Sequence, residues 1–370
     1  MSVINLSKVD IFGNETGTIN TANCYIVHEP GYYSIPLVYG NAIKNGKPNP
    51  EAYTNQKPRN HLFIDYVDYR KTPIQSPEIK TGIDGIEVLW KSDGIEVRDL
   101  SYNDHEIFFR LEWNRERKTG ENAVIAIYDC NKLCHDVIWS WHIWYYEGDL
   151  SPIYFGDHPR KKTTKNYQFA VLPVNLGWNG ETGTFYQWGR KDPFRGDIEK
   201  VRTDERSNPN LTDCIIQPDK MYQKLDYEGC ANLWDAKCEN IEDENNQNPN
   251  KSRRTIKTIY DPCPPGFKVP GCDVFRALGA KWYNQKGLCF KSSRSCCPDS
   301  DGIFFPSSGF RNRSSGDLTN VSSSGYYWSS ASYASYGQTY AYNLYFSSGR
   351  VYPVSSNNRA NGFSVRPILE

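Results

Sequence analysis

The first 150 residues alternate apolar and polar positions with a period of two. This spacing is typical of β-strands that bury one face and expose the other. Turn residues such as Gly94 separate the alternating stretches. The clearest predicted strands are residues 85–91, 94–100, 105–113 and 122–129. The pattern predicts an antiparallel β-sandwich.

Three further segments extend this sandwich. Residues 24–30 and 31–40 are rich in Tyr, Val and Ile, and we expect them to form a hairpin around the Pro-Gly pair between them. Residues 137–146 are apolar on both faces, which predicts a central strand that is buried on both sides. We interpret His142 in this strand as a hydrogen-bonded core histidine rather than a metal ligand or a general base.

The pattern changes after residue 150. Residues 151–166 are polar, basic and contain Pro and Gly, so they predict a linker. From residue 167 on, aromatic segments bounded by Gly and Pro replace the regular alternation. The charged stretch 239–254 is expected to be an exposed loop. We therefore expect a β-sandwich at 1–150 and a loop-rich α+β domain at 167–370, without long helices.

Composition agrees with a β-rich fold and narrows the choice of partners. Aromatic residues make up 14% of the 370 residues, and the 28 Gly and 22 Pro favour short strands joined by turns. The 43 basic residues balance the 43 acidic ones, which leaves no electrostatic footprint for nucleic acid or an anionic membrane. No run of about eighteen apolar residues is present, so we expect no membrane-spanning helix. The first residues lack a signal-peptide pattern, so either export does not use that route or the chain is trimmed.

The eleven cysteines do not define a metal or cofactor site. They form no C-x-x-C pair, and no His follows His158, so we expect no metal and no cofactor. Disulfides stay open, since Cys130 and Cys134 bracket a short turn, whereas the adjacent Cys296 and Cys297 are poorly placed to bridge each other. The motifs G-x-S-x-G and H-E-x-x-H and the P-loop are absent, so we expect no catalytic residues.

The end of the chain has an inverted composition. Residues 318–369 contain no Asp, Glu or Lys but hold eight of the 26 tyrosines, in a background of Ser, Asn and Gly. Antibody-like binding surfaces favour Tyr for rigid contact and Ser, Gly and Asn for adaptable hydrogen bonding. We therefore expect a recognition surface here, without carboxylates that could hold calcium.

Strand spacing separates the predicted core of this region from its predicted surface. Leu344 and Phe346 share one face of a strand and should be buried. Asn343, Tyr345 and Ser347 share the other face and should be displayed. The predicted core residues are Trp328, Leu344, Phe346, Phe363 and Val365. The candidate ligand-binding residues are Tyr333, Ser335, Tyr336, Tyr340, Tyr345, Ser347, Arg350, Tyr352, Val354, Ser355, Ser356 and Asn357.

Several longer motifs carry a resemblance to a known family. They are TANCYIV, ENAVIAIYD, WSWHIW, YQWGRKDPF, TIYDPCPPGFKVP, GYYWSS, AYNLYFSSGRVYP and NRANGFSVRP. In this order they resemble gut-bacterial surface proteins that end in a Fibrobacter succinogenes major paralogous domain, which is similar to the C-type lectin fold. The match covers most of the chain, but LPVNLGW at 172–178 replaces a DRNLGA-like segment. We therefore expect an N-terminal immunoglobulin-like β-sandwich and a C-type lectin-like domain at 167–370.

The terminal segment also resembles the variable proteins of diversity-generating retroelements, in which adenine-directed mutagenesis randomises selected Asn codons. Changes at both adenines of such a codon give Tyr, Ser, Gly or Arg, for example, but never Lys, Glu, Met or Trp. Residues 329–369 contain none of those four. Gln338 is unreachable in this way and must be a fixed position. The simpler alternative is a Ser/Tyr-rich surface hairpin without that history.

The expected function is that of a surface-displayed protein whose C-terminal segment binds an unknown protein or glycan on a cell or phage-host surface. We expect it to be extracellular, on the cell surface or on a phage particle. Two alternatives stay open. One is a pilus-tip or surface adhesin with a fixed target. The other is an enzyme, because formylglycine-generating enzymes share the scaffold and use reactive cysteines, for which Cys289, Cys296 and Cys297 are candidates.

Overall fold

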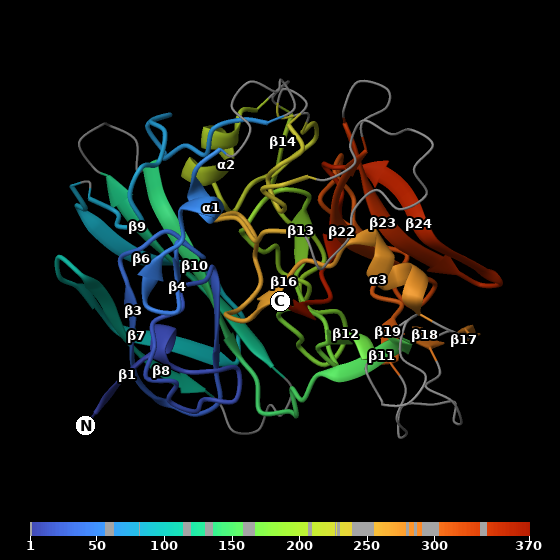
Figure 1. The fold of residues 1–370 in the computed structure, drawn as a ribbon, viewed down its shortest axis with the longest axis horizontal. Coiled ribbons are helices and arrows are strands. Elements are labelled where there is room, and N and C mark those ends of the chain that lie inside the picture. Colours follow the sequence, from blue (N-terminus) through green and yellow to red (C-terminus); the bar gives the residue numbers. More distant parts are fainter. Residues whose placement is uncertain are drawn as a thin grey trace.

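The protein is β-rich, as the composition predicts. The computed structural model describes residues 2–55, 63–80, 82–113, 120–129, 136–157, 167–205, 209–225, 227, 230–238, 255–278, 281–284, 287–290, 303–333 and 339–370. The helices within these ranges are short, namely η1 (Leu6–Lys8), α1 (Pro50–Tyr53), α2 (Leu211–Ile216) and α3 (Cys272–Ala277). None of these helices is long and apolar enough to cross a membrane. Figure 1 shows the N-terminal strands on one side of the molecule, the C-terminal strands on the other, and the end of the chain between them.

Two four-stranded sheets form the N-terminal part. In sheet order, the first contains β1 (Val3–Asn5), β3 (Gly31–Pro36), β8 (Glu106–Trp113) and β7 (Ile95–Tyr102). The second contains β2 (Cys24–Val27), β10 (Asp136–Tyr145), β9 (Glu121–Asp129) and β6 (Gly85–Lys91). Side chains of both sheets, such as Phe109 and Trp139, belong to one buried core. The four alternating stretches are confirmed as strands, whereas an immunoglobulin-like topology stays a prediction.

The expected hairpin at residues 24–40 is wrong. β2 pairs in parallel with β10 in the second sheet, whereas β3 pairs with β1 and β8 in the first. The short link between β2 and β3 therefore crosses from one sheet to the other. Alternation identifies a strand but does not identify its hydrogen-bonding partner.

β10 is the buried central strand that its sequence predicts. It lies between β2 and β9, and nine of its ten residues are buried. His142 is 2% exposed, and its Nε2 lies 2.8 Å from Asn122 Oδ1. Since the amide nitrogen of Asn122 donates to the Gly177 carbonyl, its oxygen accepts a hydrogen bond from the Nε2–H group of the ring. His142 is thus confirmed as a hydrogen-bonded core histidine, and burial lowers its pKa to about 3.

The predicted linker is in part a strand. β11 (Ile153–Asp157) pairs with β12 (Tyr167–Val171), and this pair continues through β26 (Ile368–Leu369) to β16 (Phe267–Lys268). Residues 158–166 lie outside the described part of the chain. The N-terminal and C-terminal parts are in direct contact, because the side-chain amide of Asn23 donates to the carbonyls of Ile259 and Asp261. The division into two domains stays a prediction.

The C-terminal part is built from one larger sheet and several small ones. The larger sheet has the order β21 (Leu318–Thr319), β20 (Phe310–Arg311), β25 (Gly362–Ser364), β22 (Ser324–Tyr333), β23 (Tyr340–Ser347) and β24 (Arg350–Asn358), with β13 (Phe185–Gln187) paired to β25. Its small sheets are β14 (Thr203–Asp204) with β15 (Met221–Tyr222), and β17 (Lys281–Asn284), β18 (Gly287–Phe290) and β19 (Ile303–Pro306). A further small sheet, in the N-terminal part, pairs β4 (Ile43–Lys44) with β5 (Lys47–Pro48). The charged stretch 239–254 lies outside the described residues.

Buried arginines join the loops of this part. Arg190, Arg311, Arg359 and Arg366 are each 2% exposed or less. Arg311 donates to the carbonyl oxygens of Arg195, Ile198, Glu199 and Gly316. Arg366 donates to the carbonyl oxygens of Leu172, Pro173 and Phe304 and to Asn175 Oδ1. Burial lowers the pKa of Arg311 and Arg366 to about 10, so both stay charged at neutral pH.

Arg366→Lys should therefore destabilise the protein. A lysine ammonium cannot reproduce the planar guanidinium, which donates to Pro173 on one side and to Phe304 on the other. Each buried carbonyl that loses its donor costs about 1–3 kcal/mol. We expect a loss of about 2–4 kcal/mol in the free energy of unfolding, measured by urea denaturation. The matched control is Arg350→Lys at an exposed position, which should change it by less than about 0.5 kcal/mol. Equal urea midpoints for the two variants would contradict this role.

His142 should make stability fall in acid. Its pKa is about 3 in the folded protein and 6.5 when exposed, so between these values the unfolded chain binds a proton that the folded chain does not. The free energy of unfolding should then drop by about 1.4 kcal/mol per pH unit from this residue alone as the pH falls below about 6. His142→Gln lacks this titration, so its urea midpoint should fall less steeply from about pH 6 to pH 4 than that of the wild type. Parallel pH profiles would show that His142 is not buried in its neutral form.

Candidate functional site

The predicted binding region is a three-stranded antiparallel segment with one firmly buried face. β23 lies between β22 and β24. On the buried face, Leu344 and Phe346 pack with Val274 and Phe275 of α3. All five residues predicted as core, Trp328, Leu344, Phe346, Phe363 and Val365, have 0% exposure. This part of the sequence prediction is confirmed.

The opposite face carries a row of stacked aromatic rings. Tyr326, Tyr345 and Tyr352 are direct cross-strand neighbours on β22, β23 and β24. The ring centroids of Tyr326 and Tyr345 are 4.9 Å apart, and those of Tyr345 and Tyr352 are 5.9 Å apart and nearly parallel. At the inner end, Tyr326 lies 4.9 Å from Phe363, which stacks on Trp328 at 4.1 Å. The row therefore runs from the core to solvent, where Tyr352 is 47% exposed.

Polar side chains border this row of rings. Ser347 and Arg350 are cross-strand neighbours next to Tyr345 and Tyr352, and Arg350 is exposed. Within the described residues, no carboxylate forms an ion pair with Arg350. We call the set Tyr326, Tyr345, Ser347, Arg350 and Tyr352 the tyrosine face. It combines rigid aromatic contact area with one available cation and a hydroxyl.

Other candidate residues lie on the opposite side of the sheet. Tyr333 pairs with Tyr340, and its ring lies edge-on to Tyr342 at 5.1 Å. Tyr340 and Tyr342 share the strand face of Leu344, because every second residue of a strand faces the same side and the extra residues of this region lie in β22 and β24. Tyr333 and Tyr340 thus lie apart from the tyrosine face, and their part in ligand binding stays a prediction. Tyr340 is 39% exposed, whereas Tyr333 is half-buried.

An extra residue in β24 explains further differences. Asn343 faces Ser355 and Tyr345 faces Tyr352, so β24 advances three residues where β23 advances two. Such a bulge interrupts alternation. Alternation predicts Val354 on the same side of the strand as Tyr352. Because of the extra residue, Ser355 lies on that side instead of Val354. Asn357 follows on the side of Ser355, and Ser356 lies opposite Tyr342 on the second face.

Two details of the predicted surface need correction. Asn343, expected to be displayed, has 0% exposure and lies opposite Trp328 at the inner end of the face. Tyr326 was not among the candidates although it anchors the row. Its position two residues before the core residue Trp328 was the signal that identifies its face. Ser335 and Tyr336 lie outside the described residues, as does Gln338.

The cysteines of the described residues and the Lys191–Asp192 pair are buried. Cys272 and Cys289 are buried, and burial raises the pKa of the Cys272 thiol to about 12. Cys296 and Cys297 lie outside the described residues. Lys191 Nζ is 2.6 Å from Asp192 Oδ1 and 2.5 Å from Ser140 Oγ, but both charged side chains are less than 10% exposed. A substrate would have no access to this group without a rearrangement of the core.

The comparisons with known proteins add one observation. The profile of a domain of unknown function, DUF8237, matches residues 298–368. This range contains the whole of β22, β23 and β24 together with the buried Arg311, Arg359 and Arg366. No curated protein and no solved structure matches the chain. The region of similarity therefore coincides with the scaffold that carries the tyrosine face.

Proposed function

We propose that this protein is a surface-displayed binding protein and that the tyrosine face contacts its ligand. The observation that carries the proposal is the row of rings that extends from the buried Trp328 to the exposed Tyr352. A C-type lectin-like scaffold with a retroelement-diversified segment is the form of this function that the sequence motifs favour. The ligand is a protein or glycan on a cell or phage-host surface.

The physical argument rests on entropy and contact area. A tyrosine buries a large amphipathic surface and has few rotatable bonds, so its immobilisation on binding costs little. In this row the rings are already packed against one another, which holds them in place before the ligand arrives. Arg350 adds a charge with directional donors, and Tyr and Arg are the residue types that dominate binding hot spots.

The arrangement also suits diversification. Tyr345, Ser347, Arg350 and Tyr352 each project from a backbone that is held by strand pairing and by a separate buried face. Substitution at these positions changes the displayed chemistry but leaves Phe346 and Leu344 in the core. Display and folding therefore depend on different residues, as a variable binding protein requires.

Sequencing many natural copies of this gene tests the diversification. We expect substitutions to concentrate at Tyr345, Ser347, Arg350 and Tyr352, with Trp328 unchanged, and a template repeat and a reverse-transcriptase gene nearby. Variation spread evenly over both faces of β23, or a conserved tyrosine face without these neighbouring elements, would instead favour an adhesin with a fixed target.

Alanine substitutions test the binding surface. With a glycan array and a panel of intact bacterial cells as probes, Tyr345→Ala and Tyr352→Ala should each weaken the best signal by roughly 2 kcal/mol, or about 30-fold, with or without a chelator. Tyr352→Ala should hardly change the melting temperature, because exposed substitutions usually cost less than about 0.5 kcal/mol. Tyr345 is half-buried between two rings, so Tyr345→Ala should cost about 1 kcal/mol of stability and leave the protein folded.

Two controls accompany this experiment. Tyr154→Ala removes a tyrosine that is 51% exposed outside the tyrosine face and should leave binding unchanged. Phe346→Ala removes a wholly buried ring and should cost roughly 3 kcal/mol or more of stability. If Tyr345→Ala and Tyr352→Ala unfold the protein, or if they bind as well as the wild type, the tyrosine face is not the binding surface.

A further inference from the structure

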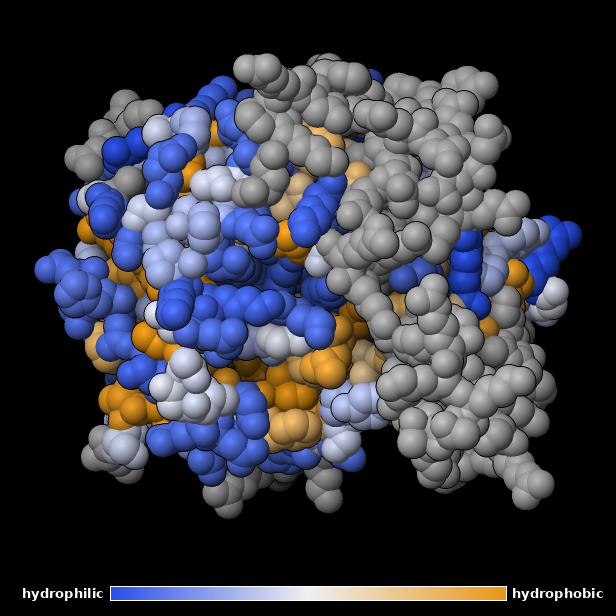
Figure 2. Space-filling view, viewed as in Figure 1, coloured by the Kyte–Doolittle hydropathy of each residue, from blue (hydrophilic) through white to orange (hydrophobic). Residues whose placement is uncertain are grey.

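A polar cleft lies where the N-terminal and C-terminal parts meet, away from the tyrosine face. Its volume is about 730 Å³, within the range of small-molecule sites. It is lined by residues of 9–51 on one side and of 255–268 with 369–370 on the other, and by none from β22, β23 or β24. In Figure 2, hydrophilic residues lie in the middle of this view, where Figure 1 marks the C-terminus, with hydrophobic residues next to them. The lining contains no aromatic ring, so a ligand would be recognised by charge and hydrogen bonds.

A tight hairpin brings Lys44 to the edge of the cleft. β4 and β5 are joined by Asn45 and Gly46, whose φ angles are 52° and 72°. Positive φ at both central residues is the requirement of the two-residue hairpin turn that Asn-Gly favours. The Asn45 N–H also donates to Asn20 Oδ1 at 2.8 Å, which ties the turn to the body of the protein. The backbone position of Lys44 is therefore well defined.

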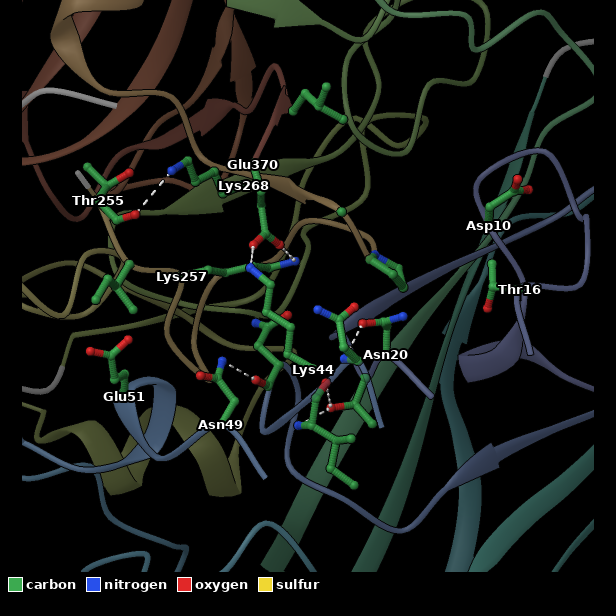
Figure 3. Close-up of a pocket in the computed structure, with 18 of the residues that line it drawn as sticks. Asp10, Thr16, Asn20, Lys44, Asn49, Glu51, Thr255, Lys257, Lys268 and Glu370 are labelled. Atoms are coloured by element: carbon green, nitrogen blue, oxygen red, sulfur yellow. Dashed lines mark hydrogen bonds and ion pairs between the residues drawn. The ribbon is translucent and has the colours of Figure 1, made fainter. Parts of the chain in front are cut away.

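A second lysine is fixed on the opposite wall. Lys257 is 6% exposed, and its ammonium donates to the carbonyls of Cys263 and Pro264, each at 2.9 Å. Lys44 and Lys257 both form ion pairs with the carboxylate of Glu370. Figure 3 shows these two ammonium groups converging on that carboxylate, whereas the Lys268 ammonium turns to the Thr255 carbonyl. The cleft thus contains a formed carboxylate-binding position.

The charges around this position favour an anion. Burial raises the pKa of Glu370, but Lys257 and Lys44 outweigh burial, so the pKa lies below its ordinary value. The other carboxylates of the lining, Asp10 and Glu51, lie on opposite sides of the cleft (Figure 3). Asp10 accepts hydrogen bonds from the backbone of its own loop.

We propose that this cleft binds an acidic sugar, such as a uronic or sialic acid. The sugar carboxylate takes the position between Lys44 and Lys257 that the Glu370 carboxylate fills. Asn20, Asn49 and Thr21 supply further amide and hydroxyl groups for the remaining sugar hydroxyls. Glu370 occupies the carboxylate position in the unliganded protein and moves out when the ligand enters. Binding here is independent of the tyrosine face.

Calorimetric titration with D-galacturonate and N-acetylneuraminate tests the proposal, with D-galactose as the neutral probe. At least one of the acids should bind, and galactose should bind at least about tenfold more weakly. Glu370→Gln removes the competing carboxylate and should tighten binding of the acid by about tenfold, since the position between the lysines is then free in a larger fraction of the protein. Added to this variant, Lys44→Met should abolish the gain.

Matched variants separate this site from other effects. Lys47→Met changes an exposed lysine of the same hairpin that does not line the cleft and should leave affinity unchanged. Tyr352→Ala should also have no effect, which keeps the outcome distinct from that for the tyrosine face. The proposal is overturned if Glu370→Gln binds neither acid, if galactose binds as well as the acids, or if Lys44→Met and Lys47→Met behave alike. In the first case Lys44 and Lys257 serve only to pair with Glu370.

Discussion

The fold of the C-terminal part depends on a hydrogen-bond donor for every buried backbone carbonyl of its loops. In a sheet the neighbouring strand supplies that donor, but this part has long stretches of loop between short strands. Arginine side chains take over the task, because one planar guanidinium offers five N–H groups in fixed directions. Arg359 shows what this achieves. It donates to the carbonyls of Cys230 and Tyr340, and its guanidinium lies over the Trp188 ring at 4.4 Å. The start of β23 is thereby fixed to the loops behind it.

The sequence predicted the strands and the core well because both depend on local periodicity. Leu344 and Phe346 are buried since every second position of a strand faces the same way. Local periodicity could not predict which strands pair with each other. β2 and β3 are adjacent in the chain yet belong to different sheets, and alternation carries no information about which strand lies alongside.

The binding surface was predicted only in part for a related reason. Alternation placed Tyr345, Ser347, Arg350 and Tyr352 together, and the structure agrees. It failed for Val354 because one extra residue in β24 shifts the register, and such a bulge leaves little trace in composition. Tyr333 and Tyr340 shared the composition of the surface but not its side of the sheet. Composition describes a region, whereas only the register decides which of its residues meet.

The bulge in β24 has a consequence for self-association. β24 is the last strand of its sheet in the described chain, so its outer backbone groups face no further strand. An edge beside exposed aromatic rings invites pairing with the same edge of another molecule. Pro353 lacks an N–H, and together with the extra residue it interrupts the regular ladder along this edge. Arg350 adds like charges that would meet if two such edges approached in register. The bulge that complicates the prediction of the surface thus also disfavours edge-to-edge pairing of two molecules at β24.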